Sequence, residues 1–279
     1  MRFRASTALV CLATLVPVSM HAAVPRPVPT ERATTRSDMV RIPAGTYRPL
    51  YAPPGVTSIH VRAFALDRTP VTRSAFLRFV QANPEWARGS VRSPLADAGY
   101  LADWPSAVSA GVAADLERPV TGVSWHAAKA YCRSQGKRLP TIDEWELAAA
   151  ASETQRNASG DPAFRRRLAA LYARRKPGVL RAVGQTSTNL YGVRDLHGVV
   201  WEWTSDFNST VADHSHHAGE RVGHAVGRGS TAERHLYCAS SAIGATDPTD
   251  YPAFARYAVR AGLNARSTVS GVGFRCAAT

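Results

Sequence analysis

Helical signals in this sequence come in short runs with a marked start and a marked stop, which confines the chain to folds built from small elements joined by loops. The stretch YCRSQGKRLPTIDEWE (residues 131–146) contains one stop and one start. Gly136 ends one helix, and Thr141 with Glu144 forms the T-x-x-E capping box that begins the next. Two helices joined by a basic turn resemble a helix-turn-helix. The pattern predicts only the local path of the backbone and does not by itself indicate DNA binding. The cysteine of this stretch, Cys132, is either catalytic or part of the scaffold.

The other periodic segments are equally short. Residues 60–66, HVRAFAL, alternate polar and apolar side chains as a half-buried strand does. We expect ordered structure to begin at 38–43, and we expect helices after the capping residues Thr72, Ser124 and Asp161. From residue 181 onward the pattern changes to short strands and loops, with residues 254–260 among them.

The N-terminal residues have the layout of a secretory signal peptide. Two arginines precede an apolar run over residues 5–20, and small residues follow it. The run is short for a membrane span, so an uncleaved anchor is the weaker alternative. We therefore expect a signal peptide at 1–23, a linker rich in Pro, Thr and Arg at 24–37, and a domain at 38–279. The mature protein is expected to be periplasmic or secreted, without stable membrane insertion.

The chain is strongly basic, with a formal net charge of +13. An exported protein rarely meets chromosomal DNA, so the charge favours an exported protein or peptide partner, or an anionic surface, over nucleic acid. Basic residues are dense in residues 153–180, which we expect to form a helical insertion beginning at Asp161. A solvated helix face is the simpler interpretation of this segment, and a docking surface for an acidic partner is the alternative.

Cysteine usage agrees with export. The chain has four cysteines, and Cys11 lies in the predicted signal peptide. The mature chain keeps Cys132, Cys238 and Cys276, an odd number. In an oxidising compartment the simplest account is one disulfide and one free thiol.

Several motifs occur together and in a fixed order. They are MVRIPAGTY, TPVTRSAF, RPVTGVSWHAAKAYC, GKRLPTIDEWELAA, NLYGVRDLHGVVWEWTSDF, GRGS and GVGFRCAA. With these motifs the chain resembles the formylglycine-generating enzyme, or sulfatase-modifying factor, family from about residue 38 to residue 279. The resemblance implies a single irregular α+β domain, related to C-type lectins, with little regular secondary structure. Within the family, FLRFVQANPEWARGSV and ADAGYLADW resemble accessory proteins associated with copper nitrite reductases.

The resemblance assigns Cys132 and Cys276 to a disulfide. The alternative for Cys132 is a nucleophile, because Lys129, Arg133 and Lys137 flank it and positive charge lowers a thiol pKa.

The resemblance also implies a calcium site. Its ligands would be the side chains of Asp195 and Glu202 and the carbonyl groups of Gly198 and Val200. Carboxylate and carbonyl oxygens are the ligands that calcium prefers. The alternative is that Glu202 only accepts hydrogen bonds from backbone amides.

The catalytic region departs from the family pattern. Family enzymes hold copper(I) between two cysteines after a G-G-S run. Here Ser230 ends R-G-S, Cys238 follows alone, and serines stand at 240 and 241. A hydroxyl is a poor copper(I) ligand, so formylglycine synthesis is not expected. Cys238 and Ser230 remain the catalytic candidates, with copper at Cys238 and His235 or a buried core thiol as alternatives.

Two further segments carry candidate binding residues. Arg256, Tyr257 and Arg260 resemble the family's substrate-groove segment, in which an extended peptide lies. The alternative, which does not exclude the first, is a helix or strand that packs Phe254, Tyr257 and Val259 inward. Four histidines in residues 214–224 could bind a transition metal loosely, but a polar loop is the simpler interpretation.

Three functions follow as hypotheses. The first is an exported accessory or maturation factor for a partner protein, which could be a copper enzyme such as nitrite reductase, without the two-cysteine site. The second is a copper- or iron-dependent oxidase, related to formylglycine-generating oxidase, that modifies a peptide side chain through Cys238. The third is a calcium-stabilised, lectin-like binding module. The first leads because it needs no complete active site.

Overall fold

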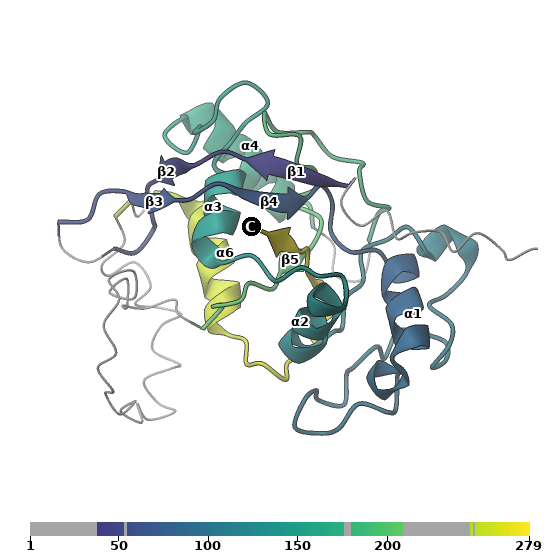
Figure 1. The fold of residues 1–279 in the computed structure, drawn as a ribbon. Coiled ribbons are helices and arrows are strands. Elements are labelled where there is room, and N and C mark those ends of the chain that lie inside the picture. Colours follow the sequence, from purple (N-terminus) through teal and green to yellow (C-terminus); the bar gives the residue numbers. More distant parts are fainter. Residues whose placement is uncertain (1–37, 53–54, 176–179, 209–245, 248) are drawn as a thin grey trace, which may run out of the picture. The chain divides into compact units, whose positions relative to one another are not determined.

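The computed structural model describes residues 38–279 apart from 53–54, 176–179, 209–245 and 248 (Figure 1). The predicted signal peptide and linker lie outside the described residues. No helix in the described part of the chain is long and apolar enough to cross a membrane. The described residues belong to one compact unit with mixed helix and strand content.

Short strands from both ends of the domain make its sheets. Strands β1 (Met39–Ile42), β4 (Phe64–Asp67) and β7 (Ala277–Ala278) form an antiparallel sheet in the order β1-β4-β7. The strands β2 (Gly45–Tyr47) and β3 (Ile59–Val61) pair antiparallel, and β5 (Trp201–Glu202) and β6 (Val272–Gly273) pair parallel. The last residues of the chain thus complete a sheet that the first strands of the domain begin.

The prediction of one strand over residues 60–66 is wrong. This segment contains the end of β3 and most of β4, which pair with different partners. Val61 and Phe64 are both buried although they lie three positions apart. A continuous strand would place them on opposite faces, so the chain must turn between them.

Four of the described helices begin directly after the capping residues predicted from the sequence, and a fifth, which was not predicted, begins after Asp250. They are α1 (Arg73–Ala82), α2 (Trp125–Ser134), α3 (Ile142–Ala149), α4 (Pro162–Ala173) and α6 (Tyr251–Ala261), with short 3₁₀ turns at Pro84–Trp86 and Ala113–Asp115. The side chains that accept a first-turn amide hydrogen are Thr72, Ser124, Thr141, Asp161 and Asp250. Each cap satisfies an amide that the helix itself cannot.

The turn before α3 is held by more than its cap. The Thr141 hydroxyl accepts from the Glu144 amide at 3.1 Å, and the Glu144 carboxylate accepts from the Thr141 amide at 2.9 Å. Arg138 donates to both Glu144 oxygens at 2.6 Å. Gly136, with φ of 66°, takes the left-handed conformation that ends α2. The capping box predicted at Thr141 and Glu144 is confirmed.

Helix α6 corrects the expectation of short strands and loops after residue 181. Its buried residues include Ala253, Arg256, Tyr257 and Arg260, which follow the i, i+3, i+4, i+7 spacing of one helix face. Two of the four are arginines, which a hydropathy pattern counts as exposed. The helical period is therefore hidden in the sequence.

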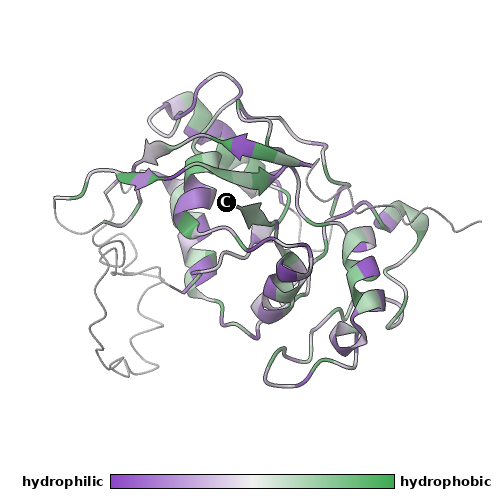
Figure 2. Ribbon diagram, viewed as in Figure 1, coloured by the Kyte–Doolittle hydropathy of each residue, from purple (hydrophilic) through white to green (hydrophobic). Residues whose placement is uncertain are grey.

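Two of the hydrophobic clusters dominate the core. One surrounds Phe76, Trp104, Tyr131 and Phe274 near α1 and α2. The other packs α3 beneath the β1-β4 sheet, with Trp145 and Leu147 among its members (Figure 1). Figure 2 shows hydrophobic and hydrophilic residues alternating along the helices, as expected for helices with one buried face. Helix α3 is the exception, since nearly all its residues are buried.

Candidate functional site

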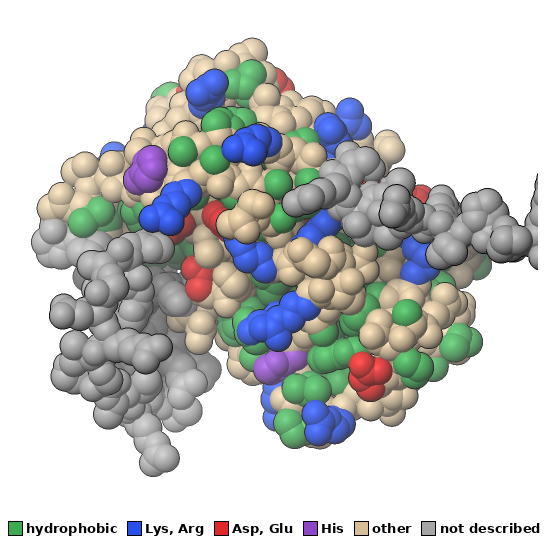
Figure 3. Space-filling model, in the orientation of Figure 1, with side chains coloured by type: hydrophobic (Ala, Val, Ile, Leu, Met, Phe, Trp, Pro, Cys, Tyr) green, Lys and Arg blue, Asp and Glu red, His purple; other side chains and the backbone are tan. Residues whose placement is uncertain are grey.

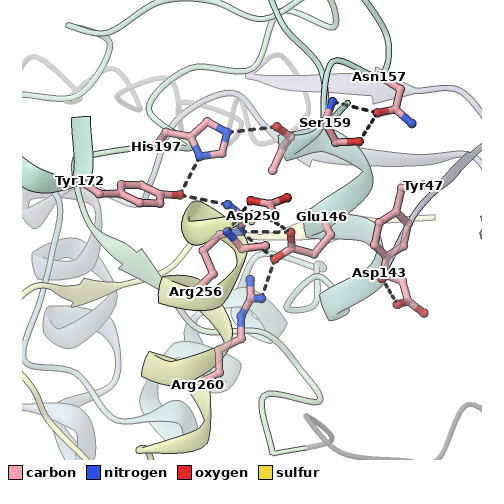
Figure 4. Close-up of polar contacts among 12 residues, drawn as sticks. Tyr47, Asp143, Glu146, Asn157, Ser159, Tyr172, His197, Asp250, Arg256 and Arg260 are labelled. Atoms are coloured by element: carbon pink, nitrogen blue, oxygen red, sulfur yellow. Dashed lines mark hydrogen bonds and ion pairs between the residues drawn. The ribbon is translucent and has the colours of Figure 1, made fainter. Parts of the chain in front are cut away.

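Glu146, near the middle of the buried helix α3, is held by two arginines of α6. Its carboxylate accepts from Arg256 Nε at 3.0 Å and Nη2 at 2.7 Å, and from Arg260 Nη1 at 2.7 Å. The arginines are four positions apart, so one helix face presents both to α3 (Figure 4). All three side chains are buried.

The two arginines stabilise the ionised form of Glu146. Burial raises the pKa of Glu146, but the positive charges of Arg256 and Arg260 outweigh it and lower the pKa to about 2. The Trp145 ring lies 5.6 Å from the Arg256 guanidinium and 5.1 Å from that of Arg260, which adds cation–π contacts. The carboxylate is therefore ionised and fully engaged at neutral pH.

A hydrogen-bonded chain continues from Arg256 to α4. Arg256 Nη1 donates to the Tyr172 hydroxyl at 3.3 Å, which lies 2.9 Å from His197 Nδ1. His197 Nε2 lies 3.0 Å from the carbonyl of Ala149. A carbonyl only accepts, so Nε2 carries the proton and Nδ1 accepts from Tyr172. Burial and the charge of Arg256 lower the pKa of His197 to about 3, which keeps this neutral tautomer.

A small pocket lies beside the Glu146–Arg256 pair. Its volume is about 100 Å³, and the end of β2, helices α3 and α4 and the start of α6 line it. That space suits a few water molecules or one side chain. The Arg165–Asp247 ion pair, at 2.6 Å, borders it. The Tyr47 hydroxyl donates to Asp143 at 2.6 Å, and burial raises the pKa of Tyr47.

Four charged side chains of the pocket wall are held in ion pairs. Glu146, Arg256, Arg165 and Asp247 all contribute to its wall, and each is already in an ion pair. These groups offer fixed hydrogen-bonding surface and charge, but neither a free base nor an activated nucleophile.

The predicted groove residues lie on one face of α6. Arg256 and Arg260 turn towards Glu146, and the Tyr257 ring packs on Tyr51 with centroids 5.3 Å apart. Arg256 and Tyr257 also line the pocket, whereas Arg260 does not. The peptide groove stays a prediction, because the guanidinium groups are engaged inside the domain.

Sequence reasoning missed three members of this cluster: Glu146, Tyr172 and His197. The one available signal is the second glutamate of EWE, which stands on the same helix as the run LAAAA. A charged side chain on the buried part of a helix requires a partner of opposite charge. The partners lie far along the chain, and local patterns do not identify them.

A second buried carboxylate, Glu202 of β5, is bound differently. Arg275 donates to both of its oxygens at 2.8 Å, and Trp145 Nε1 donates to Oε2 at 2.8 Å. The remaining Arg275 donors reach three backbone carbonyls, those of Asp67, Arg68 and Arg194. Arg275 and Glu202 side chains are fully enclosed.

The two carboxylates predicted to bind calcium both accept hydrogen bonds from other groups in this structure. Both Glu202 oxygens accept from Arg275, and the Asp195 carboxylate accepts from the Gly184 amide and from the amide and hydroxyl of Thr186. In the described part of the chain, no group of three or more His, Cys, Asp or Glu residues is placed to hold a metal. Calcium at Asp195, Gly198, Val200 and Glu202 stays a prediction that this geometry does not favour.

The disulfide between Cys132 and Cys276 is present. Their Cα atoms are 5.6 Å apart, and 144 positions separate them in sequence. Closing a loop of this length stabilises the fold by about 5 kcal/mol in the chain-entropy model. The interpretation of Cys132 as a nucleophile is therefore wrong. The flanking Lys137 forms an ion pair with Asp67 at 2.7 Å.

The catalytic candidates cannot be placed relative to this framework. Cys238, Ser230 and His235 lie outside the described residues, as do the histidines of residues 214–224. Their assignment stays a prediction.

Comparisons with known proteins give the family directly. The sulfatase-modifying factor enzyme 1-like domain matches residues 25–279. The formylglycine-generating enzyme of Streptomyces coelicolor is 30% identical, with 92% of this chain and 94% of that protein covered. The inactive C-alpha-formylglycine-generating enzyme 2 of Bos taurus is 28% identical, over 60% of this chain and 70% of that protein.

Solved structures resemble the chain more distantly. The structure of PvdO from Pseudomonas aeruginosa is 18% identical and covers 88% of this chain and 96% of its own, with a TM-score of 0.42. The assignment accordingly rests on the sequence matches, which span nearly the whole domain. The chain belongs to the sulfatase-modifying factor family, whose members include formylglycine-generating enzymes.

Proposed function

We propose that this chain is an exported accessory or maturation factor that binds a partner protein and does not carry out two-cysteine copper chemistry. The observation that carries the proposal is that the disulfide leaves the domain with one free cysteine. Of four in the chain, Cys132 and Cys276 form the disulfide. Cys11 lies in the predicted signal peptide, so Cys238 is left as the single thiol of the domain.

One thiol does not make the copper(I) site of a formylglycine-generating oxidase. Soft thiolate sulfur selects copper(I), and the serines at 240 and 241 are poor substitutes. The bovine relative is itself named as an inactive enzyme, so loss of the chemistry has a parallel among the proteins this chain resembles.

Export is supported by two independent features. The N-terminal segment has the basic and apolar layout of a signal peptide. The Cys132–Cys276 bond belongs to the oxidising compartments outside the cytoplasm. Both favour a periplasmic or secreted site of action.

The nature of the partner follows from the resemblance of residues 76–91 and 96–104 to accessory proteins of copper nitrite reductases. A copper enzyme in the same compartment is therefore the partner we propose. The pocket beside Glu146 supports a binding role, because four charged residues of its wall are held in ion pairs and offer a fixed hydrogen-bonding surface.

A direct test compares activity with maturation. The mature protein, copper(I) and oxygen are incubated with a cysteine-containing peptide, and mass spectrometry follows oxidation of the thiol, with the Streptomyces coelicolor enzyme as positive control. The peptide is expected to remain unmodified. In parallel, deletion of the gene is expected to lower the copper-loaded fraction of an exported copper nitrite reductase. Peptide oxidation that is lost in Cys238→Ser would overturn the proposal.

A further inference from the structure

The outward face of α4 carries positive charge that the described carboxylates do not neutralise. Arg165 pairs with Asp247 at 2.6 Å, and Arg167 pairs with Glu153 at 2.7 Å. Arg166 and Arg174 are exposed, and no described carboxylate lies within ion-pair distance of either. Described carboxylates therefore neutralise Arg165 and Arg167 but leave the charges of Arg166 and Arg174 unpaired by any of them.

This helix is held firmly against the domain. Phe164 and Leu168 are buried with Ala158, and Tyr172 is hydrogen-bonded to His197. A rigid surface loses little conformational entropy when a partner binds to it. The exposed arginines are therefore presented at a fixed spacing.

The exposed face has a simple composition. Ala163, Arg166, Ala170 and Arg174 are exposed and follow one another at spacings of three, four and four residues. Because the alanine side chains are small, they do not block the approach of a partner surface to the two arginines. Arginine pairs with a carboxylate through two parallel hydrogen bonds, so this face fits carboxylates on a closely approaching surface.

A protein surface fits this face better than a membrane does. Helices that bind membranes expose large apolar or aromatic side chains that enter the lipid. Phe164 and Leu168 of α4 are buried in the domain, and Leu171 packs against the same cluster. Figure 3 shows that basic side chains are also more widespread than acidic ones over the face drawn there. The chain has a formal net charge of +13, so as a whole it attracts negative charge.

We propose that the face of α4 formed by Ala163, Arg166, Ala170 and Arg174 docks an acidic surface of the partner protein. The inference rests on the proposed function in one respect, namely that the chain acts by binding another protein. It adds the site and the charge of the contact.

The experiment measures binding of a fluorescent twelve-residue peptide of Asp and Glu by anisotropy, with the matching Asn and Gln peptide as blank. The double variant Arg166→Glu/Arg174→Glu is compared with Arg78→Glu/Arg92→Glu, which changes the net charge equally at two exposed arginines elsewhere. The α4 variant is expected to bind roughly tenfold more weakly at low salt, and the control less than about twofold. High salt should weaken binding by the wild type.

The alternative outcomes are distinct. Equal losses in both double variants would show that only bulk charge matters, and an unchanged affinity in the α4 variant would also overturn the proposal. Binding of phosphatidylglycerol vesicles that depends on α4, with no binding of the peptide, would replace the protein partner with a membrane. If the Glu variant unfolds, Arg166→Gln/Arg174→Gln takes its place. Peptide thiol oxidation would overturn the proposed function but leave this result standing.

Discussion

Two buried glutamates, each next to a tryptophan, meet arginines in contrasting ways. Glu202 is bound by a single arginine, Arg275, whose other donors reach carbonyls of separate chain segments. Glu146 is bound by two arginines of a single helix, and it borders the pocket. The first arrangement ties the C-terminal segment to the end of β4, to the segment around Arg194 and to β5. The second fixes α6 to α3 beside the pocket.

The contrast shows what charge burial does in this domain. A buried ion pair is not itself strong evidence for stability, because desolvation opposes the attraction. Removing one partner is costly, however, since it leaves the other charged in an apolar interior. The two clusters should therefore differ in how many partners can be removed before the glutamate is left alone.

The largest effect is expected at the cluster with one arginine. Arg275→Met leaves Glu202 buried without its cation and should lower the free energy of unfolding by about 3–5 kcal/mol. Urea denaturation measures the loss. The double variant Arg275→Met/Glu202→Gln should recover part of it. A loss below about 1 kcal/mol would contradict the role of Arg275 as a clamp.

The next effect concerns acid. The folded pKa of Glu146 is about 2 and its ordinary value is 4.5, so the unfolded chain binds the proton more readily between these values. The stabilisation is complete above pH 4.5 and is lost as the pH falls through about 2. Its size is about 3 kcal/mol, and stability measured against pH should lose this slope in Glu146→Gln. An unchanged slope between pH 4.5 and 2 would rule out the assignment.

A smaller loss is expected for one arginine of the Glu146 cluster. Arg260→Met leaves the carboxylate with the Arg256 contacts and should cost about 1–3 kcal/mol in urea denaturation. Arg256→Met should cost more, because Arg256 also donates to Tyr172. If Arg260→Met lowers the free energy of unfolding as much as Arg275→Met does, the proposed difference between the two clusters is wrong.

The smallest effect is expected at Tyr172. Tyr172→Phe removes the hydroxyl that donates to His197 and should lower stability by about 1 kcal/mol. Tyr251→Phe, at a side chain that is 62% exposed, is the neutral control.

Local chemistry accounts for the features that could be predicted from sequence. The caps at Thr72 and Thr141 depend on side chains within three residues, and both helices start where the motifs indicate. The Cys132–Cys276 pairing came from family resemblance and is confirmed. The irregular α+β domain is confirmed in the same way.

The features that were missed depend on distant partners. Nothing local distinguishes Arg256 on a buried face from an exposed arginine, because its partner Glu146 lies 110 positions away. The break between β3 and β4 depends in the same way on which strands they pair with. For Glu202, the family resemblance indicated a calcium ligand. In the structure its carboxylate accepts hydrogen bonds from Arg275, which lies 73 positions further along the chain.

The central claim is that this domain lacks a two-thiolate copper site, and copper(I) titration against a competing chromophoric chelator tests it most directly. With Cys132 and Cys276 bonded to each other, wild type and Cys238→Ser are expected to compete equally poorly for copper(I). Tight binding of one copper(I) ion by the wild type, lost in Cys238→Ser, would contradict the account.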